Sequence, residues 1–149
     1  MLYETLVIGL IVSVLYTEWT DIFPGGIIVP AYMAFYMDQP LKVLMTIFIA
    51  VLSLMTYKFL SRFLILFGKR RFVMFILIGI FWSQLWFLIQ PPIFHEPLGL
   101  ETIGWIIPGL LANNLERQNF LLTLASLLTT SVLIYFMVRT LSGFGVLPW

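Results

Sequence analysis

Long apolar segments recur along this sequence, and their length sets the first limit on its fold. A helix needs about 20 mainly apolar residues to cross the hydrocarbon core of a membrane. The segments that meet this length are Leu2–Thr20, Leu41–Leu60, Phe72–Ile89 and Phe120–Val138. We therefore predict four long transmembrane helices.

Composition points to the same class of protein. Hydrophobic residues make up 61% of the 149 residues and charged residues only 10%, whereas a soluble domain carries roughly 25% charged residues. Too little polar surface remains to cover a soluble globule, so membrane lipid is the expected solvent. The sequence predicts an all-α integral membrane protein. Its net charge of +1 offers no polybasic surface for nucleic acid.

Two shorter apolar segments, residues 22–37 and 100–115, are interrupted by helix-breaking residues. The residues that interrupt them include Gly26, Pro30, Gly104, Pro108 and Gly109. Proline removes a backbone donor and glycine loosens the chain, so neither segment is expected to form one continuous helix. Such segments persist at membrane depth only where protein or a water-filled cavity satisfies the freed backbone groups. We therefore predict that they form the functional part of the chain.

The two interrupted segments also match each other. Residues 26–34 (GIIVPAYMA) align with residues 104–112 (GWIIPGLLA) at an offset of 78 (104 minus 26), with glycine, proline and alanine at the same spacing. The same offset pairs Asp38 with Glu116. This match predicts an internal twofold repeat.

Each repeat consists of a long helix, an interrupted segment and a second long helix. The repeats cover residues 2–62 and 72–141 of a single membrane domain, and a basic cytoplasmic loop, 63–71, joins them. If the interrupted segments cross the membrane, each repeat has three crossings and the two repeats are inverted. If they are re-entrant or lie at the membrane surface, each repeat has two crossings and the repeats are parallel. The sequence leaves both topologies open.

The densest basic stretch is Lys69, Arg70 and Arg71. The positive-inside rule places this stretch in the cytoplasm. Four crossings then put both termini inside, and six put both outside. Lys58 and Arg62 lie just upstream, at a spacing that predicts one shared helix face.

A search for catalytic and metal-binding patterns finds little. Gly68 and Lys69 are followed by arginine rather than serine or threonine, so they do not make a phosphate-binding loop. No serine stands with a histidine and an acid in a nucleophile pattern. The single His95, beside Glu96, is better explained as part of a wet interfacial loop than as a metal ligand. We predict no catalytic residue, no metal and no cofactor on this chain.

The interrupted segments suggest a role in anion passage. Proline favours the first helical turn, so Pro30 and Pro108 are expected to start half-helices over residues 31–37 and 109–115. Free N–H groups at such starts carry partial positive charge, and paired broken helices in transporters direct them at anionic substrates. A tight turn between packed helices explains the same residues equally well. The candidate path residues are Gly26, Pro30, Gly104, Pro108, Gly109, Asn113 and Arg117.

Three motifs, in this order, resemble those of a known family. They are GIIVP at 26–30, FLILFGKRRF at 63–72 and GWIIPGLLAN at 104–113. They are similar to the small membrane component of bacterial poly-γ-glutamate synthase, the PgsC/CapC capsule biosynthesis family. The resemblance runs from about Glu18 to the last helix. Ala31 departs from the family, which usually has glycine after the proline, as at Gly109 here.

The resemblance implies a non-catalytic subunit of a capsule synthase and export complex in the bacterial cytoplasmic membrane. A ligase-like partner of the same system is then expected to bind ATP and Mg²⁺ and to form the γ-amide bonds, and an export-related partner to serve release. The polymer, poly-γ-glutamate, would pass the interrupted segments, while Lys69, Arg70 and Arg71 dock the ligase. The family supplies no established catalytic residue.

Two other functions compete with this interpretation. The predicted repeat also suits a stand-alone small transporter or channel. A membrane-embedded enzyme is the third class, and the shortage of catalytic groups counts against it. Since one chain of 149 residues encloses little space, a conduit would need several copies or partner helices.

Overall fold

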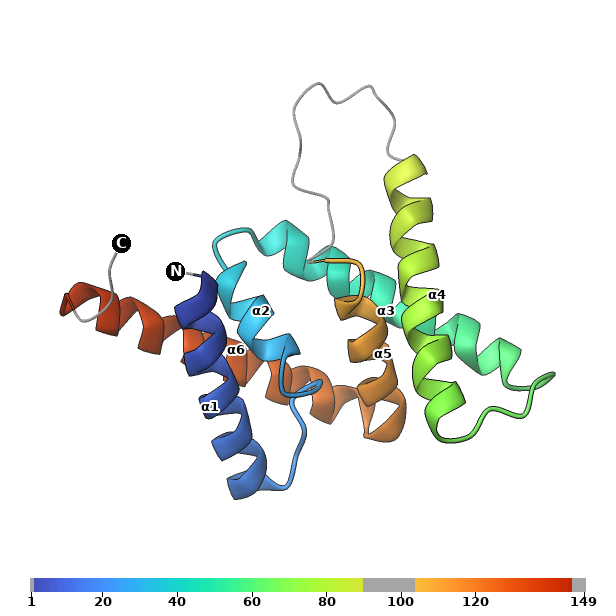
Figure 1. Ribbon diagram of the computed structural model, residues 1–149, viewed down its shortest axis with the longest axis horizontal. Helices are drawn as coiled ribbons and strands as arrows, with labels where there is room; N and C mark the ends of the chain where they lie inside the picture. The colour runs from blue at the N-terminus through green and yellow to red at the C-terminus, as the bar shows by residue number, and fades with distance from the viewer. Residues whose placement is uncertain (1, 90–103, 146–149) are drawn as a thin grey trace. The chain divides into compact units, whose positions relative to one another are not determined.

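The computed structural model describes residues 2–89 and 104–145, apart from the side chain of Leu2. Within these ranges the chain forms six α-helices and no strand, which confirms the all-α prediction. The helices, in chain order, are α1 (Leu2–Thr20), α2 (Val29–Phe35), α3 (Pro40–Leu60), α4 (Lys69–Ile89), α5 (Ile107–Arg117) and α6 (Phe120–Gly143) (Figure 1).

Three of these helices, α3, α4 and α6, are long and apolar enough to cross a membrane. The fourth predicted span, α1, forms a helix over the predicted residues, and its crossing of the membrane stays a prediction. The predicted loop 63–71 is wrong at its end, because α4 begins at Lys69. Lysine and arginine are good helix formers, and Gly68, with φ 61°, ends the loop just before them.

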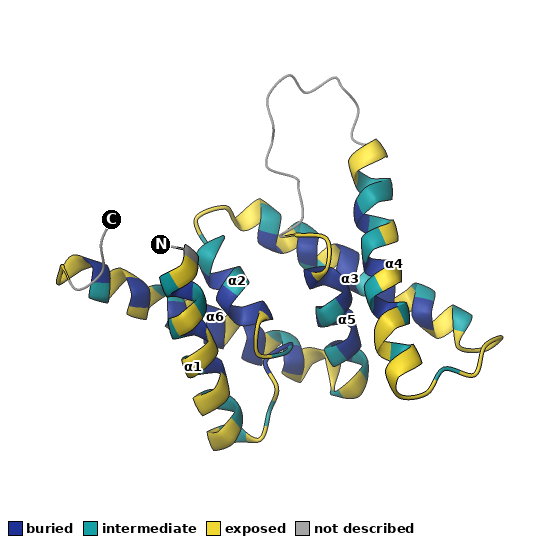
Figure 2. Ribbon diagram, viewed as in Figure 1, coloured by how far each residue is buried: buried dark blue, intermediate teal, exposed yellow. Residues whose placement is uncertain are grey.

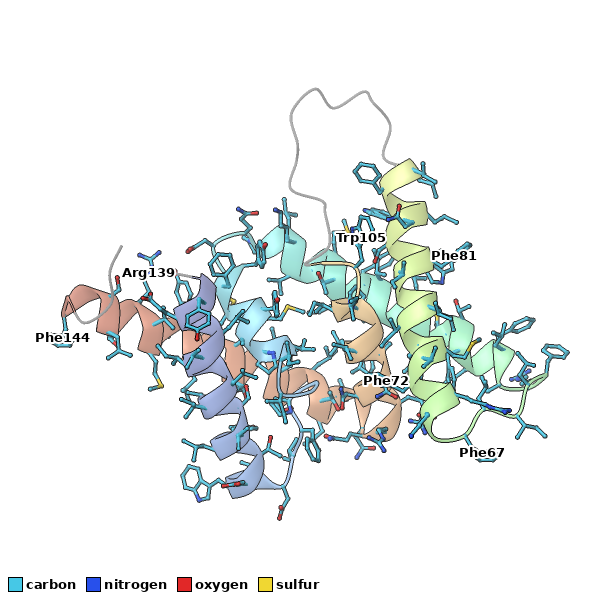
Figure 3. The ribbon with its side chains drawn as sticks, viewed as in Figure 1. Phe67, Phe72, Phe81, Trp105, Arg139 and Phe144 are labelled. Carbon is cyan, nitrogen blue, oxygen red and sulfur yellow. The ribbon has the colours of Figure 1, made fainter. Side chains whose placement is uncertain are left out.

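Burial follows a pattern expected in lipid. Between 22% and 33% of the residues in each spanning window are buried inside the protein, so most apolar side chains of these helices face outward. Figure 2 shows exposed residues as yellow stretches of the ribbon along α4 and α6, and Phe81 on α4 projects outward in Figure 3. Small hydroxyl residues are buried beside the apolar core: Ser13, Thr46, Ser53, Ser83, Thr123, Ser126, Thr130 and Ser131. Small and hydroxyl side chains are typical of helix contacts in membranes.

The helices divide into two compact units. Unit 1 (Met1–Asp38 and Gln118–Trp149) contains α1, α2 and α6, and unit 2 (Gln39–Arg117) contains α3, α4 and α5. In each unit the short helix, α2 or α5, packs against both long helices, which also contact each other. The long helix that follows each short helix in sequence therefore packs in the other unit. The predicted repeat boundaries are not tested by this division.

In unit 1, helices α1 and α2 approach each other closely at one point. A Cβ atom on Gly9 would lie 2.9 Å from the Cα atom of Ala31. Because Gly9 has no side chain, the methyl group of Ala31 fits directly against the backbone of α1. The alanine that departs from the family pattern therefore packs into a space that Gly9 leaves.

Unit 2 contains the corresponding approach, between α4 and α5. A Cβ on Gly79 would lie 2.7 Å from the amide nitrogen of Gly109, and a Cβ on Gly109 would lie 2.6 Å from the carbonyl oxygen of Phe75. Both glycines are needed, since the atoms opposite them are backbone and cannot move aside. Such close backbone approach is characteristic of membrane helix pairs with small residues.

Each interrupted segment contains a short helix that begins near its proline, as predicted. Pro30 and Pro108 are each the second residue of a short helix, which confirms their place in the first turn. Both helices start two residues earlier than expected. Gly26 and Gly104 precede them with φ of 109° and 66°, a conformation that glycine adopts without strain.

The backbone contact at Gly109 predicts a large effect of one methyl group. Gly109→Ala should lower the free energy of unfolding of the purified protein by about 1–3 kcal/mol, and with it the unfolding temperature. The reason is that the new Cβ meets the backbone of α4. Gly143→Ala is the control, since no atom lies within 4 Å of its added Cβ. Equal unfolding temperatures for the two variants would show that α4 and α5 are not in backbone contact.

Candidate functional site

Unit 2 holds the larger group of candidate residues, arranged along two antiparallel helices. Near one end, Arg71 of α4 forms an ion pair with Glu116 of α5. Two turns further along α4, Gly79 meets Gly109 in the first turn of α5. The start of α5 therefore lies toward the C-terminal half of α4, and its end lies beside the basic stretch.

A cavity of about 610 Å³ adjoins this ion pair. Its walls come from Tyr57 in the last turns of α3, the connecting segment 61–68, Arg71 and Glu116. Tyr57 is held in place by stacking on Phe75 of α4, with the ring centroids 4.0 Å apart. The cavity thus brings two guanidinium groups, those of Arg62 and Arg71, together with a single carboxylate.

The basic residues fall into two groups. Lys69 and Arg70 are exposed, while Arg71 is partly buried in its ion pair. Figure 3 labels Phe67 and Phe72 on either side of this stretch. The predicted shared face of Lys58 and Arg62 is wrong, because α3 ends at Leu60 and Arg62 lies in the loop that lines the cavity.

Unit 1 contains a smaller polar group just after α2. The hydroxyl of Tyr135 on α6 donates to Asp38 Oδ1 at 2.8 Å, and the guanidinium of Arg139 approaches the same oxygen at 3.3 Å. Arg139, labelled in Figure 3, also lies over the ring of Tyr135, 5.4 Å from its centroid. Arg139 and Asp38 are exposed, so their ion pair adds little to stability.

The candidate path residues occupy both units. Pro30 is buried and Gly26 half-buried in unit 1. In unit 2, the residues Pro108, Gly109 and Asn113 are buried in α5, whereas Gly104 and Arg117 are exposed. Neither compact unit contains both interrupted segments, and the pairing of the two in one path stays a prediction.

Two serines that sequence reasoning missed lie next to the glycine contacts. Ser13 and Ser83 each follow the contact glycine of their helix by four residues and so share its face. Both are buried, and neither hydroxyl has a hydrogen-bond partner in the part of the chain that the structure describes. Other buried hydroxyls bond to a backbone carbonyl in their own helix, as in Ser53, Thr130 and Ser131. The shared Gly-x-x-x-Ser spacing was the feature that could have identified them.

The suggested interfacial loop with His95 and Glu96 lies outside the described residues. Among residues 2–89 and 104–145, no three histidine, cysteine, aspartate or glutamate side chains come together in a metal-binding group. The metal prediction for His95 is therefore untested.

Comparison with known proteins gives a consistent result. Residues 8–124 match the capsule biosynthesis CapC family. A capsule biosynthesis protein CapC of Bacillus anthracis is 38% identical over 132 residues, which cover 87% of this chain and 88% of that protein. A PGA biosynthesis protein CapC of Bacillus subtilis (strain 168) is 33% identical over 131 residues, with the same coverage of each chain. No solved structure matches the chain.

The unpartnered serines give a test of the glycine contacts. Ser83→Ala and Ser13→Ala should unfold at the same or a higher temperature than the parent, because a buried hydroxyl without a partner costs about 1–3 kcal/mol. Ser131→Ala, which loses a bond to the carbonyl of Leu127, is the matched control. A marked loss of stability in Ser83→Ala would mean that its hydroxyl is bonded in the folded protein.

Proposed function

This chain belongs to the capsule biosynthesis CapC family, and from that premise we propose that it is the non-catalytic membrane subunit of a poly-γ-glutamate synthase. It works as a multi-pass protein of the bacterial cytoplasmic membrane. A partner ligase binds ATP and Mg²⁺ and forms the amide bonds, and a further partner serves export. The chain supports this assembly and contributes to the path of the polymer.

The observation that carries the proposal is the burial of the two broken helices. Most residues of α2 and α5 are buried in their units, and each short helix packs closely against a glycine of a long helix. Figure 2 draws them largely in the colour of buried residues. A segment with free backbone groups at membrane depth must be shielded from lipid in this way. If α2 and α5 had faced the lipid instead, the chain could have served only as a packing scaffold.

A polymer with one carboxylate per residue needs compensation for every charge it carries into the membrane. An isolated charge at the bilayer centre costs at least about 2.5–3.5 kcal/mol. The N-terminal turn of α5, with Pro108 and Gly109, offers backbone N–H groups and the positive end of a helix dipole. The seven residues of α2 make a weaker dipole. The proposed path therefore depends more on unit 2 than on unit 1.

An internal duplication with exchanged third helices accounts for both units. Each unit combines a long helix, its short helix and the last long helix of the other repeat. The contact glycines, Gly9 and Gly79, face Ala31 and Gly109, which the sequence match had already paired. If α1 is the counterpart of α4, it crosses the membrane as α4 does. This would give the fourth long span.

The basic start of α4 is the proposed docking site for the ligase. Lys69 and Arg70 are exposed there, and the positive-inside rule places them on the cytoplasmic side, where ATP is available. The cavity beside Arg71 opens at the same end of unit 2. A polymer leaving the ligase would meet this end first.

A stand-alone transporter or channel is the second candidate, and the matched arrangement of the two units favours it. Co-expression with a candidate ligase followed by affinity purification separates the two. Recovery of a stable complex supports the role in a synthase. Transport of a small solute by the purified chain alone, with no complex formed, would support the transporter.

Removing the exposed charges should weaken docking. The double variant K69Q/R70Q should bind the ligase roughly 2- to 30-fold more weakly, since each exposed ion pair contributes about 0.2–1 kcal/mol. Polymer output should fall while the amount of chain in the membrane stays constant. Arg71 is left unchanged, because its substitution would also break the pair with Glu116.

Lys58→Gln provides the control for this pair of substitutions. Lys58 is an exposed cation in the last turn of α3, outside the proposed docking site. Its substitution should leave ligase binding and polymer output near the parent values. If K69Q/R70Q behaved like Lys58→Gln, the start of α4 would have no part in docking.

A further inference from the structure

The cavity in unit 2 has more positive than negative side chains in its wall. Arg62 and Arg71 contribute two positive charges to the wall, and Glu116 is the single acid in it. Tyr57 and Ser61 add two hydroxyl groups. The wall therefore carries one positive charge in excess. Its donor side chains are Arg62, Arg71 and Tyr57, since the hydroxyl of Ser61 already donates to the carbonyl oxygen of Lys58.

Arg71 is the central donor of this wall. One of its terminal nitrogens is paired with Glu116, while its Nε–H is buried with no hydrogen-bond partner in the described part of the chain. Arginine presents its donors as a rigid fork that matches both oxygens of a carboxylate. The pair with Glu116 leaves this fork incompletely used.

The remaining lining is apolar. Segment 61–68 contributes Phe63, Leu64, Ile65, Leu66 and Phe67 to the cavity. Phe63, Leu64, Ile65 and Phe67 are half or more exposed, so the cavity is open along this segment and a ligand can enter from that side. The volume, about 610 Å³, lies within the usual range for sites that hold a small organic ligand.

We propose that this cavity binds a carboxylate group of a γ-glutamyl chain, with Glu116 as the internal carboxylate that the ligand displaces from Arg71. When the cavity is empty, Glu116 neutralises Arg71, so this partly buried guanidinium is not left uncompensated. When the ligand enters, its carboxylate binds the guanidinium of Arg71 in place of Glu116. Arg62 then compensates the second carboxylate charge in the cavity. The identity of the ligand, though not the carboxylate site itself, rests on the proposed synthase function.

Competition between Glu116 and the ligand gives opposite predictions for the two members of the pair. Arg71→Gln removes the ligand's main partner and should weaken binding about tenfold or more. Glu116→Gln removes the competitor and should tighten binding severalfold. A purely structural ion pair predicts no such difference in sign.

The measurement uses the full chain in lipid nanodiscs and a fluorescent pentamer of γ-linked glutamate, followed by fluorescence anisotropy. Arg139→Gln is the matched control, since Arg139 also pairs with an acid and contacts a tyrosine, but in unit 1. Its affinity should equal that of the parent. The unfolding temperature of each variant, measured in parallel, separates loss of binding from loss of fold.

A second probe separates the site from the proposed function. An α-linked glutamate pentamer carries the same charges on a different backbone. If it alone binds, with the same response to Arg71→Gln and Glu116→Gln, the carboxylate site stands and the γ-glutamyl assignment fails. If Glu116→Gln leaves the affinity unchanged or lowers it, or if no pentamer binds the folded parent, the cavity proposal is overturned.

Discussion

Close contact at a glycine of a long helix, between Gly9 and Ala31 and between Gly79 and Gly109, is the interaction on which both units depend. In lipid there is no hydrophobic force to drive apolar helices together, so close van der Waals packing must do so. Because glycine has no side chain, the short helix can lie directly against the long helix. This packing shields the unpaired backbone groups at the ends of the short helix from lipid. The helix-breaking residues of the short helices and the glycines of the long helices therefore act together to hold each unit.

The exchange of α3 and α6 between the units adds a second constraint. Each short helix is enclosed by a long helix that precedes it and by a long helix from the other half of the chain. In unit 1 this places Asp38 against Tyr135, and in unit 2 it places Glu116 in the same cavity as Tyr57. In both units, an acid at the end of the short helix or just after it is grouped with a tyrosine of the exchanged helix. The two polar groups differ in their arginine, which is exposed in unit 1 and partly buried in unit 2.

Much of the local structure could be predicted from the sequence, because it depends on neighbouring residues. The length of α1, the place of Pro30 and Pro108 in a first turn, and the glycines before them all follow from short-range rules. The start of α4 was missed because charge was taken as a mark of a loop, although Lys69 begins the helix. The sequence could not predict that Arg71 pairs with Glu116, or that α2 packs against α6 rather than α3. Both contacts join residues far apart in the chain.

The exchange of the third helix can be measured directly, because the chain contains no cysteine. Ala34 of α2 packs with Ile134 of α6 in a buried cluster, and the repeat offset of 78 makes Thr56 of α3 the counterpart of Ile134. Oxidation in native membranes should join Ala34→Cys to Ile134→Cys within one chain and leave Ala34→Cys with Thr56→Cys unlinked. Efficient linkage of the second pair and none of the first would contradict the account, because α2 would then pack with the helix that follows it.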